Sequence, residues 1–136
     1  MEMDEIVDQL QKEVGDALQQ VLASKTYQTV CIAGKSLGTP IASTLINAID
    51  IPHKKLILLT PVWTSVEDAG TTIPTLIIIG TDDGAFIPDQ AESDTRTNVT
   101  WKVYPDLNHC LEYADDWQNS ITILGDIIGM CEAFLR

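Results

Sequence analysis

The segment AGKSLGT, residues 33–39, contains the side chains with the clearest chemical potential in the chain. Its Gly-Lys-Ser tripeptide is typical of a nucleotide site, yet the same residues form G-x-S-x-G centred on Ser36, a turn that presents a serine nucleophile. A phosphate-binding loop also needs a glycine five residues before Gly34, and that position is Thr29, inside an apolar, strand-like run. The spacing therefore favours the nucleophile over the phosphate loop.

A serine nucleophile requires a general base and an acid that orients the base. The chain has two histidines: His53 precedes a predicted strand, whereas His109 follows one. Asp82 and Asp83 also follow a predicted strand and are the candidate acids. The candidates occur in the order serine, aspartate, histidine, and both aspartates remain open at this point.

Alternating strand and helix patterns position these residues. Apolar β-rich runs predict strands at 27–33, 55–60, 75–80 and 100–104. Helical periodicity predicts a helix at 39–49 and one at each end of the chain, with a short helix between the third and fourth strands and a loop at 61–74. The first helix has an apolar face of Ile6, Val7, Leu10, Val14, Leu18, Val21 and Leu22, and the last has one of Trp117, Ile121, Leu124, Ile128, Cys131 and Leu135. Asp115 or Asp116 caps that last helix.

This alternation predicts an α/β fold, a three-layer parallel sheet flanked by helices on both faces. Ligands bind such sheets at the carboxyl ends of the strands. Ser36, the two aspartates and His109 all follow strands and are therefore expected at that edge, whereas His53 is expected at the opposite edge.

Composition narrows the function classes. The chain has 136 residues, a single-domain length, and its net charge of −12 argues against nucleic acid or an anionic membrane as partner. The N-terminus is acidic, unlike a secretory signal, and no apolar run reaches the length of a membrane span. The three cysteines match neither a disulfide framework nor a metal cluster, so we expect a cytoplasmic protein without a metal or cofactor.

Three motifs resemble those of the α/β-hydrolase superfamily. VCIAGKSLGT resembles its nucleophile elbow, LIIIGTDDGAFIP its acid motif and YPDLNHCLE its histidine loop, in the family's order. Counted from Gly80, the acid motif selects Asp83, but Pro88 comes one residue late and leaves Asp82 open. The resemblance implies that residues 1–136 form one α/β-hydrolase-like domain, most similar to small serine esterases without a cap.

The resemblance also implies a catalytic triad of Ser36, Asp83 and His109, with the Leu37 N–H in the oxyanion hole. It implies a serine hydrolase that acts on small ester, thioester or amide substrates. The family's first four strands and the second oxyanion donor have no counterpart here. The strand at 28–33 would then be an open edge, covered by a second copy of the chain or by a missing piece.

Several assignments remain alternatives. Lys35 contacts substrate or is solvated, Trp63 lines the pocket or belongs to the core, and Cys110 is expected to be a buried thiol. Because the front half of the family fold is missing, the rival to the enzyme is a truncated or degenerate hydrolase-fold module that binds or assembles without catalysis.

Overall fold

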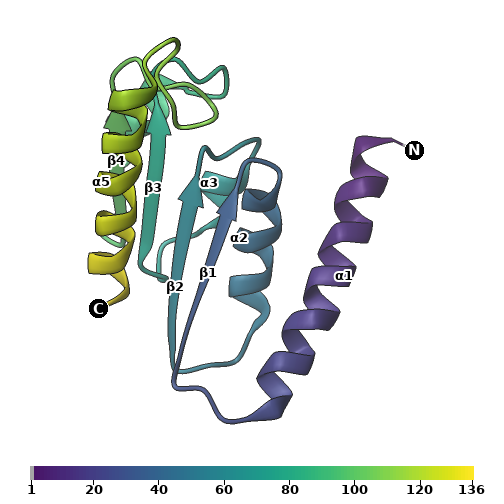
Figure 1. The fold of residues 1–136 in the computed structure, drawn as a ribbon. Coiled ribbons are helices and arrows are strands. Elements are labelled where there is room, and N and C mark those ends of the chain that lie inside the picture. The colour runs from purple at the N-terminus through teal and green to yellow at the C-terminus, as the bar shows by residue number, and fades with distance from the viewer. Residues whose placement is uncertain (1) are drawn as a thin grey trace.

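The structure, a computed structural model, describes residues 2–136. In these residues strands and helices alternate along the chain (Figure 1). The helices are α1 (Met3–Ser24), α2 (Gly38–Ala48), α3 (Ser65–Asp68), α4 (Pro88–Ser93) and α5 (Trp117–Leu135), and the strands are β1 (Thr29–Lys35), β2 (His53–Leu59), β3 (Thr75–Gly80) and β4 (Val99–Tyr104). Each predicted strand is present within two residues of its expected bounds. The short helix α3, within the 61–74 interval, was not predicted.

The four strands form one parallel sheet in the order β1-β2-β3-β4. Helices α2 and α3 pack on one face and α5 on the other, with α1 standing outside α2 (Figure 1). The predicted α/β class is therefore confirmed. Because all strands run the same way, their carboxyl ends meet at one edge of the sheet, and every segment that follows a strand begins there.

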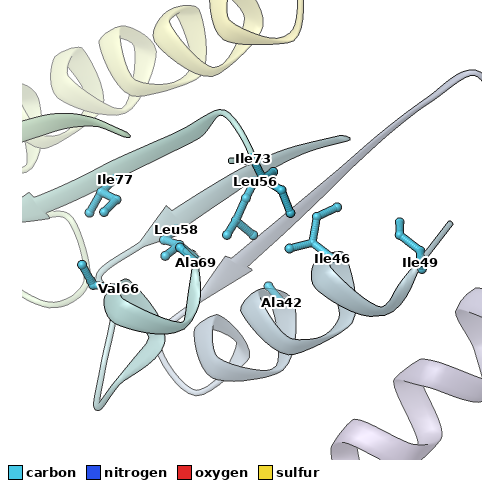
Figure 2. Packing of buried hydrophobic residues seen from close by; sticks show 9 residues of the cluster. All are labelled: Ala42, Ile46, Ile49, Leu56, Leu58, Val66, Ala69, Ile73 and Ile77. Atoms are coloured by element: carbon cyan, nitrogen blue, oxygen red, sulfur yellow. The ribbon is translucent and has the colours of Figure 1, made fainter. Parts of the chain in front are cut away.

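The larger core lies between the sheet and helices α2 and α3 (Figure 2). Ile46 of α2, Leu56 and Leu58 of β2 and Ile77 of β3 have no exposed surface, and Figure 2 shows them in the layer between the strands and helices α2 and α3. Strand β3 is buried along its whole length. This explains its unbroken apolar sequence, because a central parallel strand is covered on both faces.

Helix α5 packs through a different face from the one predicted. A second, smaller core lies between α5 and the other face of the sheet. The α5 residues in it are Ile123, Ile127, Met130 and Phe134, together with Cys131 from the predicted set. The other predicted residues are at least half exposed: Trp117, Ile121, Leu124, Ile128 and Leu135. Both sets repeat at helical spacing, so periodicity alone could not identify the face that meets the sheet.

Helix α1 also differs from its prediction. None of its residues is buried, and only Leu18 and Leu22 of its apolar face pack against the core, whereas Val14 and Val21 are exposed. The helix begins with a capping box between Glu2 and Glu5. At α5, the carboxylate of Asp116 accepts the Asn119 N–H, which selects Asp116 over its neighbour as the cap.

Candidate active site

The sharp turn between β1 and α2 presents Ser36. Its backbone is left-handed, with φ of 50°, which is uncommon for a residue other than glycine. Both backbone polar groups of Ser36 are hydrogen-bonded. The N–H donates to Leu59 O at 3.0 Å. The carbonyl oxygen accepts from the Thr39 N–H at 2.9 Å and from the Thr39 Oγ1 hydroxyl at 2.6 Å. These bonds hold the turn in its strained conformation.

Glycine is required on only one side of this turn. A Cβ at Gly34 would lie 2.5 Å from the Gly38 carbonyl oxygen and 2.9 Å from the Ala42 Cβ. A Cβ at Gly38 would meet no atom within 4 Å. Of the two glycines in G-x-S-x-G, Gly34 is therefore required because the strand and the helix approach closely there. Gly38 has room for a side chain.

Ser36, His109 and Asp83 form a continuous hydrogen-bonded chain. The Ser36 Oγ lies 2.7 Å from His109 Nε2, and His109 Nδ1 lies 2.8 Å from Asp83 Oδ2. The three residues follow β1, β4 and β3, so they meet at the shared carboxyl edge of the sheet. His53 is the first residue of β2, at the other edge.

The structure pairs the histidine with Asp83 and not with Asp82. The Asp83 side chain is 1% exposed, and its second oxygen, Oδ1, accepts the Ala85 N–H at 2.9 Å. Asp82 is exposed, and its N–H donates to Leu107 O at 3.1 Å. A buried carboxylate with both oxygens engaged holds one orientation, which fixes the imidazole that it faces.

Gly80 brings the aspartate and histidine loops together. A Cβ at this position would lie 1.9 Å from the Leu107 carbonyl oxygen, so only glycine lets the two segments approach this closely. The loops are also joined by the Thr81 N–H, which donates to Tyr104 O, and by the Asp106 N–H, which donates to Thr81 Oγ1. The glycine before the acid motif therefore positions the acid next to its base.

Lys35 and Trp63, the two predicted substrate contacts, lie in different environments. Lys35 Nζ donates to the His109 carbonyl oxygen at 3.1 Å, so this ammonium bridges the elbow and the histidine loop. Trp63 follows β2, has a left-handed backbone with φ of 53° and is 56% exposed, which excludes the alternative that it is core. Cys110 is exposed, and the prediction of a buried thiol there is wrong.

Thr39 is a site residue that the sequence interpretation missed. It is fully buried, and its Oγ1 donates to Ser36 O and accepts the Val62 N–H at 3.2 Å. It thereby connects the elbow to the loop that carries Trp63. A signal was present in the sequence, because a threonine in the first turn of a helix commonly bonds to nearby backbone.

A cavity of about 480 Å³ lies beside the histidine loop. Its walls include Cys110 and Leu111, directly after His109, and Trp117 and Leu124 of α5. This volume is within the range of small-molecule sites. Across residues 2–136, no group of three or more histidine, cysteine or acidic side chains is placed to hold a metal ion.

No helix in the described part of the chain is long and apolar enough to cross a membrane. The sequence matches no protein-family model and no curated protein. Solved structures, in contrast, share its fold.

One similar structure is a protein of unknown function from Agrobacterium tumefaciens, named as a candidate α/β hydrolase, with a TM-score of 0.70 and 18% identity. Another is an α/β hydrolase enzyme from the metagenome of lagoon sediments at Mar Chica, Morocco, with a TM-score of 0.59 and 14% identity. The matches cover 92% and 90% of this chain, and 58% and 71% of the respective relatives. The chain thus has the α/β-hydrolase fold and spans somewhat over half the length of the first of these structures.

Proposed function

We propose that this chain is a serine hydrolase that cleaves small esters, thioesters or amides through an acyl-enzyme. The observation that carries the proposal is the pair of hydrogen bonds from Ser36 Oγ to His109 Nε2 and from His109 Nδ1 to Asp83. A hydroxyl, an imidazole and a buried carboxylate in this order are the parts of a nucleophile–base–acid triad.

In the proposed reaction, Ser36 Oγ attacks the acyl carbonyl while His109 Nε2 accepts the hydroxyl proton. His109 then gives that proton to the leaving group as the bond between carbonyl carbon and leaving atom breaks. Water, deprotonated by the same nitrogen, then attacks the acyl-serine, and His109 returns the proton to Ser36 Oγ as the bond to the acyl carbon breaks and the acid is released. Asp83 holds the Nδ1–H tautomer throughout and stabilises the imidazolium.

The oxyanion is proposed to bind at the N-terminal end of α2. Leu37 follows Ser36 with helical torsions, φ of −55° and ψ of −24°, as the N-cap of α2. Its N–H is the proposed donor, aided by the positive end of the helix dipole. A hole with one donor fewer is expected to be slower by about a hundredfold or more, so we propose a slow enzyme unless a second donor is supplied.

The substrate is proposed to be small. The 61–74 interval after β2 contains only the one-turn helix α3 and no lid. Trp63, exposed on this interval, is the proposed contact for the acyl group, and the cavity beside the histidine loop is a candidate site for the leaving group. Two of the cysteines, Cys31 and Cys131, are weaker nucleophiles than an exposed thiol, because burial raises their pKa.

The experiment is labelling with a fluorophosphonate probe, read by intact mass and by mapping of the modified peptide. We expect one adduct, on Ser36, and none in Ser36→Ala or His109→Ala. His53→Ala is the matched control, because it removes the other histidine at the far edge of the sheet and should label normally. A folded wild-type protein that does not react would contradict the proposal and favour the rival, a hydrolase-fold module without catalysis.

A further inference from the structure

The outer edge of β1 is a row of backbone groups without a partner strand in the described structure. The sheet order places β1 at one edge and β4 at the other. Directly after β1 the Ser36 N–H donates to Leu59 O, and directly before it Gln28 O accepts the His53 N–H, so the even-numbered residues of this segment bond to β2. Because bonding alternates along a parallel pair, the N–H and C=O of Cys31 and Ala33 point outward.

This edge lacks the features that usually prevent strands from pairing with other chains. Exposed edges are commonly protected by charged side chains, proline or a bulge. Strand β4 carries Lys102 in its middle, whereas residues 26–34 contain neither a charge nor a proline. The chain as a whole has a net charge of −12, so this neutral stretch, flanked by Lys25 and Lys35, is a place where two copies can approach.

We propose that two copies of this chain pair through β1, antiparallel and related by a two-fold axis, to form one eight-stranded sheet. The edge is complementary to itself, because each outward N–H meets an outward C=O when a second copy runs in the opposite direction. Full overlap of the seven-residue strand sets Cys31 opposite Ala33 of the second copy and centres the axis on Ile32. Lys35 then lies opposite Thr29, so no like charges face each other.

Side chains on both faces support the pairing. Val30 and Ile32 are half-buried on the α2 side and would gain cover from their counterparts in the second copy. Ala33 is exposed although it lies in a strand of the sheet, and it is small enough to admit a neighbouring strand. Strand pairing thus satisfies the backbone and buries apolar surface at the same time.

The first test is hydrogen exchange, read amide by amide in the wild-type protein. The amides of Val30 and Ile32, bonded to β2, should exchange slowly at every concentration and serve as internal controls. Those of Cys31 and Ala33 should exchange at least about a hundredfold more slowly in concentrated than in dilute protein. Rapid exchange of these two amides in concentrated protein would overturn the proposal.

The second test is sedimentation of a matched pair of variants. Ala33→Pro removes an outward N–H and leaves the ladder to β2 intact, whereas Ala33→Val adds bulk and keeps that N–H. We expect a dimer for wild type and Ala33→Val and a monomer for Ala33→Pro. If Ala33→Pro does not fold, Ala33→Glu places a charge beside the axis and should also be a monomer. A wild-type monomer, or a dimer that persists in folded Ala33→Pro and Ala33→Glu, contradicts pairing through β1.

Discussion

At the scale of the residue, Ser36 is the most constrained position of the site. Its left-handed backbone costs about 1–3 kcal/mol, and the bonds from Thr39 and to Leu59 supply the compensation. The result is a hydroxyl held 2.7 Å from the His109 imidazole. The same constraint explains why Gly34 must remain small, since the strand and helix on either side of the serine almost touch.

We predict different roles for the two neighbouring aspartates. Asp83→Asn should reduce the rate of fluorophosphonate labelling by about three to four orders of magnitude, because an amide no longer stabilises the imidazolium and favours the wrong tautomer. Asp82→Asn is the matched control and should label at the wild-type rate, since that carboxylate is exposed. Equal rates for the two variants would show that Asp83 does not act through His109.

The two glycines of the elbow provide a second matched pair. Gly34→Ala should lower the free energy of unfolding by about 1–3 kcal/mol, because the new methyl group overlaps the Gly38 carbonyl and Ala42. Gly38→Ala should change it by about 0.5 kcal/mol or less, since its Cβ enters open space. Urea titration of both variants measures the difference, and similar losses would mean that the close approach at Gly34 is not what the glycine serves.

At the scale of the element, strained backbone gathers at the edge that carries the site. All left-handed residues other than glycine in the described chain follow β1, β2 or β4: Ser36, Thr60, Trp63, Asp106, Leu111 and Asp115. None of these residues lies within a strand or helix of the described chain. The rigid sheet therefore supports loops in conformations that a free peptide would rarely adopt, as is common at functional sites.

A partly buried ion pair between Asp94 and Arg96 joins two segments away from the site. Asp94 accepts from Arg96 at 2.6 Å and from the Trp101 indole at 2.9 Å, and Arg96 reaches the carbonyl oxygens of Val66 and Gly70. The pair thus ties the segment before β4 to α3. The hydrogen bonds from Arg96 are the main cause that lowers the pKa of Asp94 well below its usual range.

We predict that Asp94→Asn lowers the free energy of unfolding by about 2 kcal/mol at neutral pH. Since the folded-state pKa is depressed, the contribution of Asp94 is fully present above the ordinary aspartate pKa of about 4 and is lost as pH falls toward the folded value. Wild type and variant should therefore converge in acid. Asp50→Asn, an exposed carboxylate, is the control for denaturant titrations at each pH. A constant difference across this range would contradict the assigned role.

At the scale of the whole molecule, the chain matches only part of the length of the structures that share its fold. It spans 58% of the length of the similar Agrobacterium tumefaciens structure, and β1 ends the sheet where no further strand follows in the described residues. Helix α5 likewise exposes a stripe of five large apolar side chains. A small sheet with an open edge buries less apolar surface per residue than a larger domain, and the proposed pairing through β1 would bury more of it.

The proposed pairing makes stability depend on protein concentration. We predict that the thermal midpoint of the wild-type protein rises with concentration, because association stabilises the folded state by mass action. The midpoint of Ala33→Pro should stay constant over the same range, and that of Ala33→Val should rise. Calorimetry of the three proteins measures this, and a wild-type midpoint that does not move would be evidence against the dimer.

The sequence by itself determined the strands, the α/β class and the residues able to form the site. Short apolar runs rich in β-branched residues, such as Thr75–Gly80, are typical of strands covered on both faces, and G-x-S-x-G between a strand and a helix is a local signal. Only the tertiary structure decided between Asp82 and Asp83, directed Lys35 to the histidine loop and chose the packing face of α5. Such choices depend on contacts between segments far apart in the chain, 73 residues for Ser36 and His109, and local spacing holds no information about which side chains meet across that separation.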